Sequence, residues 1–196
     1  MMLTLALILG MASAIAWPAI DRAAASAELA QTVSNGANIY KAAFASQMDS
    51  LVLGGDQPVW PQKGQYRTST EYFIELVESG ALNVTYDFFA APGLLPARSS
   101  DPRDFKAENN AWRMVLGLDN APPGTPFLFT RNYDPDALRA DDEPIVLNDE
   151  PPFGTNGLVV VLSGGAAFFL KGDQLRNSFF NPAGTSLDPG LEIVGP

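Results

Sequence analysis

The chain begins with a run from Met1 to Ile20 that carries no charge. As a helix rising about 1.5 Å per residue, this run would span roughly 30 Å, the thickness of the hydrocarbon core of a bilayer. Pro18 lies inside the run, and an alanine-rich segment comes after it without a turn signal. The sequence therefore predicts one long helix that is apolar throughout its first half and then continues into water.

Three interpretations of the apolar run are open. A cleaved secretory signal would carry basic residues ahead of the apolar stretch, whereas the first Lys or Arg here is Arg22. A plain transmembrane anchor fits the length, but such anchors usually end at a basic cluster, and here alanines come after Asp21 and Arg22. The third interpretation is one helix of about 50 residues that is wholly apolar in its first half and apolar on one side in its second, and it also fits the next segment of the chain.

That next segment has the pattern of an amphipathic helix. Apolar residues recur three or four positions apart, which is typical of a face packed on a core: Leu29, Val33, Ala37, Tyr40, Phe44, Met48 and Leu51. The pair Gly54-Gly55 predicts that the helix ends near Val52. We expect an apolar helical segment over residues 1–25 and one globular head over 26–196 that includes the amphipathic half of the helix.

The rest of the chain predicts an α+β domain with a small antiparallel sheet. Thr68–Gly80 reads as a short helix, because Thr68 and Glu71 form a capping box and Gly80 can end it. Its predicted buried face is Tyr72, Phe73, Leu76 and Val77. Strands are expected at Asp87–Ala90, Trp112–Leu118, Phe127–Thr130, Leu158–Leu162 and Ala166–Leu170, and the last two are joined by a tight turn at Ser163–Gly165. The tail after Asn181 offers little to pack.

Composition argues against several functions. The formal net charge of −10 disfavours nucleic acid as a partner, and the absence of Cys and His removes the usual nucleophile–base pairs and zinc ligands. The acidic stretch from Asp134 through Asp136 to Asp141–Glu143 could offer oxygen ligands to Ca²⁺, but it lacks the EF-hand spacing, and a solvated loop is the simpler interpretation. Glu71, Glu75 and Glu78 read as a solvated helix face. We expect no enzyme activity, no cofactor and no metal site.

Several segments resemble the type IV pilins and type II secretion pseudopilins. "GMASAIAWPAI" (residues 10–20) is similar to the second half of their N-terminal helix, and "MMLTLALILG" is similar to the segment just after the Phe-Thr-Leu-x-Glu start of their mature chains. That start, the leader and the early Glu have no match here. "STEYFIELVESGAL", "ENNAWRMVLGL", "TPFLFTRNY" and "FGTNGLVVVLSGGAAFFLKG" resemble successive motifs of the Verrucomicrobia and Lentisphaerae type of pseudopilin-like protein, with Ser163-Gly164-Gly165 where an Asp-Gly turn is common.

The resemblance implies a pilin-like fold and a structural role. Such a subunit sits in the inner membrane, is handled by pilus or secretion assembly machinery, and becomes part of a homopolymeric filament at the cell surface or in the periplasm. The residues expected to pack in the filament core are Met1, Leu3, Leu5, Leu7, Ile8, Met11, Ile15, Trp17 and Ile20. Gly10 and Pro18 are expected to mark a break in the helix. The alternative function is a monomeric, membrane-anchored periplasmic binding domain.

Overall fold

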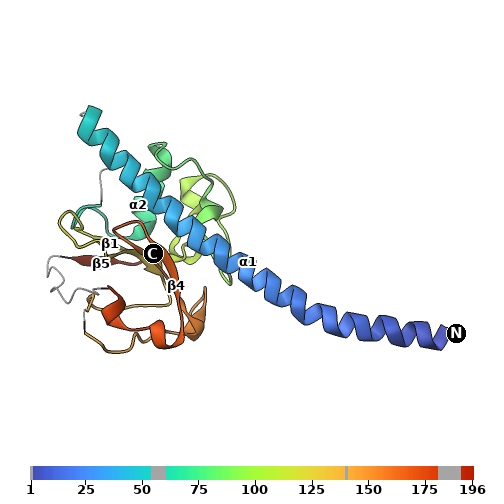
Figure 1. The fold of residues 1–196 in the computed structure, drawn as a ribbon. Helices are drawn as coiled ribbons and strands as arrows, with labels where there is room; N and C mark the ends of the chain where they lie inside the picture. Colours follow the sequence, from blue (N-terminus) through green and yellow to red (C-terminus); the bar gives the residue numbers. More distant parts are fainter. Residues whose placement is uncertain (1, 54–60, 140, 181–190) are drawn as a thin grey trace.

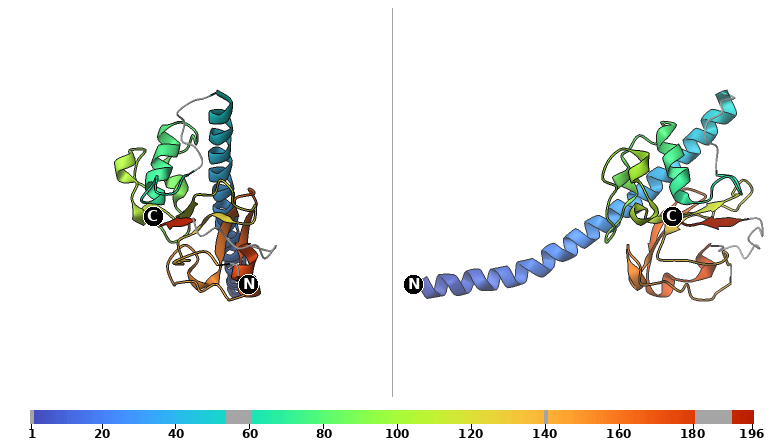
Figure 2. Two further views of the ribbon diagram at one scale, coloured as in Figure 1. Left: turned by 90° about the vertical axis from the view of Figure 1, so that its left-hand side faces the viewer. Right: turned by 180° about the vertical axis from the view of Figure 1, so that it is seen from behind.

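The structure is a computed structural model that describes residues 2–53, 61–139, 141–180 and 191–196, with side chains given from Arg22 onward except for Leu51 and Leu53. One long helix, α1 (Met2–Leu53), crosses the head diagonally, and its N-terminal part projects away from it (Figure 1). α1 is helical up to Leu53, and Gly54-Gly55, which predicted its end, lie outside the described residues. Figure 2 shows that the projecting part curves gently.

The head contains a five-stranded sheet whose neighbouring strands all pair antiparallel in the order β4-β3-β2-β1-β5. The strands are β1 (Trp112–Leu116), β2 (Pro126–Thr130), β3 (Leu158–Leu162), β4 (Ala167–Leu170) and β5 (Glu192–Val194). The predicted α+β class and four of the predicted strands are therefore confirmed. The turn at Ser163–Gly165 joins β3 to β4 as expected, with Gly165 at φ +85°.

The short helix α2 (Ser69–Glu78) begins and ends as its sequence predicts. The Thr68 hydroxyl accepts a hydrogen bond from the Glu71 N–H at 3.1 Å, and Gly80 comes after the helix with φ +79°. The reciprocal half of the capping box is displaced by one residue, because the Glu71 carboxylate accepts from the N–H of Arg67 at 2.9 Å. Tyr72, Phe73 and Leu76 are buried and Val77 is half-buried.

The predicted strand at Asp87–Ala90 is wrong, because Tyr86–Phe89 forms a 3₁₀ turn. Residues three apart share a side of a 3₁₀ helix, and this places both Tyr86 and Phe89 in the core while Asp87 is exposed. The Phe89 ring stacks on Phe73 of α2 with centroids 4.6 Å apart. Burying two aromatic rings on one side outweighs the strand propensity of the segment.

The expectation that the tail packs little is also wrong for its last residues. β5 extends the sheet by pairing with β1, and Val194 is buried. The Gly195 carbonyl then accepts the N–H of Ser69 at 2.8 Å, so the C-terminus is tied to the start of α2. Residues 181–190 of the tail lie outside the described residues.

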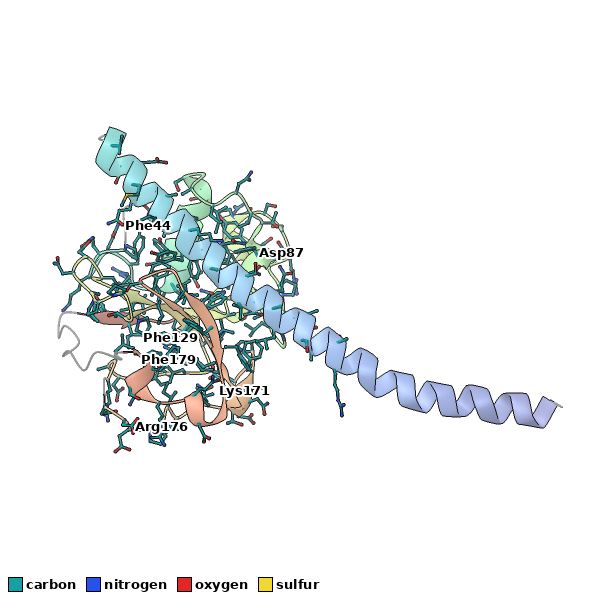
Figure 3. The ribbon with its side chains drawn as sticks, in the orientation of Figure 1. Phe44, Asp87, Phe129, Lys171, Arg176 and Phe179 are labelled. Carbon is teal, nitrogen blue, oxygen red and sulfur yellow. The ribbon has the colours of Figure 1, made fainter. Side chains whose placement is uncertain are left out.

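Both faces of the sheet are covered. Every residue of β2 is buried, with α1 on one face and an aromatic cluster on the other. That cluster runs from Phe129 through Tyr133 to Phe180 and Phe179, and Figure 3 shows Phe129 and Phe179 on the side of the sheet away from α1. α1 therefore packs on one face of a sheet whose other face is also covered.

Candidate interaction site on the long helix

The face by which α1 docks on the head is made mainly of small and polar side chains. Its buried residues recur every three or four positions along the helix: Thr32, Asn35, Gly36, Ile39, Ala42, Ala43 and Ser46. The predicted face is therefore wrong in phase by about one residue, or roughly 100° around the helix. Leu29, Val33, Ala37 and Tyr40 lie at the margin of the contact, and the side chain of Leu51 is outside the described residues.

Close approach explains why small residues occupy this face. A Cβ atom placed on Gly36 would lie 2.8 Å from the Trp112 ring and 2.8 Å from a methyl group of Val161. Trp112 and Val161 are fully buried, on β1 and β3 respectively. The helix backbone at Gly36 thus rests directly on the sheet, which a larger residue would prevent.

Polar side chains fix the position of α1 along the sheet. The Asn35 amide donates to the carbonyl of Phe88 at 2.9 Å and accepts from the Gln31 amide at 3.0 Å. Five residues later along the helix, the Tyr40 hydroxyl donates to the carbonyl of Ser163 in the β3–β4 turn at 2.9 Å. Directional bonds of this kind specify one register, which apolar packing alone would specify less strictly.

Gly165 in the same turn is needed for this contact. A Cβ atom on Gly165 would lie 2.7 Å from the Tyr40 ring, and the residue also has a positive φ. The β3–β4 turn can therefore pack against the Tyr40 ring only because residue 165 is glycine.

The helix leaves the head at Leu29, which is half-buried, and every residue from Arg22 to Glu28 is exposed. We call Met2–Glu28 the arm. At about 1.5 Å per residue the arm extends roughly 40 Å, and Figure 1 shows it projecting clear of the sheet. Its backbone is helical throughout, including Gly10 and Pro18.

The predicted filament-core residues fall on the first part of the arm. Met1 lies outside the described residues, and so do the side chains of Leu3, Leu5, Leu7, Ile8, Met11, Ile15, Trp17 and Ile20. Over the side chains that the structure does describe, no helix combines the length and apolar character that crossing a membrane requires.

A second exposed feature lies at the other end of α1. Phe44, Met48 and Val52 are spaced four residues apart and keep 43%, 40% and 80% of their surface exposed. The Phe44 ring stacks on Tyr40 with centroids 5.9 Å apart, and Figure 3 shows Phe44 beside the upper half of α1. Sequence reasoning places Phe44 and Met48 in the core, whereas they form an exposed apolar stripe.

The acidic segment from Asp134 to Glu143 distributes its carboxylates among separate partners. Asp134 pairs with Arg113 at 2.9 Å, Asp141 accepts from the Asn177 amide at 2.7 Å, and Asp142 pairs with Arg176 at 3.3 Å. Residue 140 is not described; within the described parts of the chain, no three Asp, Glu, His or Cys side chains gather closely enough to hold a metal ion. Glu71, Glu75 and Glu78 are exposed on α2.

The buried tyrosines remain protonated at ordinary pH. Burial raises the pKa of the Tyr133 phenol to about 12, and burial likewise raises the pKa of Tyr72 well above its usual range. A phenol with a raised pKa is a poor general base near neutral pH. The Tyr133 hydroxyl donates to the side-chain oxygen of Asn177 at 3.4 Å, whereas the Tyr72 hydroxyl has no hydrogen-bond partner among the described residues.

Sequence reasoning missed the docking residues Thr32, Asn35, Gly36 and Ser46. A signal was present, since these small or polar residues recur at helical spacing between larger ones.

No family model matches the chain, and neither the curated proteins nor the solved structures contain a match to it.

Proposed function

We propose that the chain is a structural subunit of the pilin or pseudopilin type that polymerises through the apolar first part of the arm. The observation that carries the proposal is the continuity of α1, which runs from a docked segment in the head into an arm whose described residues, Arg22–Glu28, are all exposed. A head that holds one end of a projecting helix in a fixed register can present the other end for assembly.

The charge-free run explains why the arm needs partners. Each large apolar side chain of Met1–Ile20 would gain about 1.5–3 kcal/mol on leaving water. Lipid can cover this surface before assembly, and the arms of neighbouring copies can cover it in a filament. The inner membrane, the assembly machinery and other copies of the chain are therefore the proposed partners, and a surface filament or periplasmic pseudopilus is the proposed location.

In this proposal the two halves of α1 have different roles. The apolar half would form the filament core, and the amphipathic half carries the pilin-like head on the filament surface. Along the described half, exposed Lys41 and Asp49 and buried Ile39 and Ala43 support this amphipathic character.

The experiment compares two substitutions at one position of the arm. Ile15→Lys places an unpaired charge in a dry helix contact, where it costs several kcal/mol, whereas Ile15→Leu keeps the apolar surface. After detergent removal we expect the wild type and Ile15→Leu to sediment as filaments visible by electron microscopy, and Ile15→Lys to remain unassembled.

The alternative function predicts a different result. If the chain is a monomeric, membrane-anchored binding domain, the wild type and Ile15→Leu should be monomers in detergent and should form no filaments after the detergent is removed. Filaments of normal diameter from Ile15→Lys would also contradict the proposal, because they would show that this position is wet.

A further inference from the structure

The sequence contains two Asn-Gly pairs, Asn35-Gly36 and Asn156-Gly157. In such a pair, the backbone nitrogen of the glycine can attack the side-chain amide carbon of the asparagine. Glycine leaves that nitrogen least hindered, because it has no Cβ. The fold buries the asparagine of one pair and exposes that of the other, and this determines which pair can react.

The first pair is protected. Asn35 keeps only 7% of its surface exposed, and both ends of its amide are hydrogen-bonded, to Phe88 and to Gln31. Gly36 lies in the interior of α1, where its N–H belongs to the helical hydrogen-bond ladder. Attack by that nitrogen requires the helix to open and to leave the sheet.

In the second pair the asparagine side chain is exposed, whereas Gly157 itself is buried. Asn156 is exposed at the end of a 3₁₀ turn (Gly154–Asn156), and its side-chain amide has no hydrogen bond to the described parts of the chain. The N–H of Gly157 likewise donates to no backbone acceptor among the residues that the structure describes. The nucleophile and its target therefore carry no internal bonds that must first break.

The packing around this turn requires the glycine. A Cβ atom on Gly157 would lie 2.3 Å from the Phe169 ring, so any residue with a side chain would clash at this position. The Asn132 amide donates to the carbonyls of Gly154 at 2.7 Å and Gly157 at 2.8 Å, and so holds both ends of the turn. The fold thus keeps an Asn-Gly pair directly before β3, with the Asn156 side chain exposed and Gly157 buried.

We propose that Asn156 is a site of spontaneous deamidation in the folded protein. The Gly157 nitrogen gives up its proton to water and bonds to the side-chain carbonyl carbon of Asn156; the bond from that carbon to the side-chain nitrogen then breaks as this nitrogen takes up a proton from water, which releases ammonia. Water then opens the resulting cyclic imide at either carbonyl, giving aspartate or isoaspartate. Either product adds a negative charge to a chain whose formal net charge is already −10.

The test monitors both pairs in the same sample. The full-length chain, kept dispersed in mild detergent, is incubated at slightly alkaline pH, and peptides covering both pairs are measured by mass spectrometry. We expect Asn156 to show the mass gain of amide hydrolysis at least about tenfold faster than Asn35, because Asn35 reacts only through rare opening of α1. In urea the two rates should converge.

One control variant and two possible outcomes decide the proposal. Asn156→Gln lengthens the side chain and disfavours the cyclisation, so the mass gain should vanish from that peptide. Retention of the Asn156 amide in the folded protein, over a time in which the urea sample loses it, would overturn the proposal. Equal rates at Asn35 and Asn156 in the folded protein would overturn it as well.

Discussion

Replacing Gly36 by alanine should destabilise the head, although the same change on an exposed helix face would stabilise it. Alanine in a helix interior is favoured over glycine by about 1 kcal/mol. At Gly36, however, the new methyl group would meet Trp112 and Val161, each at 2.8 Å. The sign of the net effect therefore measures how closely α1 lies on the sheet.

The contact geometry sets the magnitude. Overpacking a core by one or two methylene groups costs about 1–3 kcal/mol, and the upper part of this range applies because Trp112 and Val161 are both fully buried. Subtracting the gain in helix propensity leaves a loss of about 1–2 kcal/mol in the free energy of unfolding. For a domain of this size that loss lowers Tm by about 3–6 °C.

The assay is thermal and urea denaturation of the fragment 26–196, monitored by circular dichroism once its folded spectrum is established. Ser34→Ala is the matched control, since Ser34 is exposed on the same turn of α1 and gains helix propensity without a clash. We expect Ser34→Ala to leave Tm unchanged or slightly raised while Gly36→Ala lowers it. A higher Tm for Gly36→Ala than for the parent would refute the close docking of α1.

Three further predictions concern the head, and a fourth concerns the arm. Asn35→Ala removes the bond to the Phe88 carbonyl and should cost about 1–3 kcal/mol, measured by urea denaturation; an unchanged midpoint would contradict it. The Tyr133 phenol keeps its proton in the folded state up to a pKa of about 12 but ionises near 10.0 when unfolded, so stability present below pH 10 should fall as the pH rises from 10 to 12, and Tyr133→Phe should weaken that fall. EDTA should leave the Tm of the head unchanged, and a drop restored by Ca²⁺ alone would point to the Asp134–Glu143 loop. In assembled filaments Gly10–Pro18 should lose helical hydrogen bonds, because Pro18 has no N–H, and an unbroken helix in the density would contradict this.

The phase of α1 shows where sequence reasoning reaches its limit. Its helical nature depends on local signals that need no partner. Its buried face depends on the shape of the sheet, where the ring of Trp112 fills the space opposite Gly36. The spacing of large apolar residues does not reveal a helix face whose small residues let the helix backbone lie close to the sheet. That spacing therefore assigns Phe44 and Met48 to the core, although both are exposed.

The errors elsewhere have a similar origin. The run at Tyr86–Phe89 has strand propensity, but its two buried rings lie three residues apart. Phe89 stacks on Phe73 and Tyr86 stacks on Phe105, and a 3₁₀ turn allows both contacts. The short strand β5 has only Ile193 and Val194 as its signal, and its pairing with β1 comes from the far end of the chain. Local elements with caps or tight turns, such as α2 and the β3–β4 hairpin, are predictable because their determinants are contiguous in sequence.

The most direct test of assembly through the arm is electron microscopy of the full-length chain after detergent removal, beside the fragment 26–196. We predict filaments from the full-length chain and dispersed, folded monomers from the fragment, because only the full-length chain retains the uncharged run from Met1 to Ile20. Filaments of the same diameter from the fragment would show that the heads assemble without the arm, and that result would contradict the proposed function.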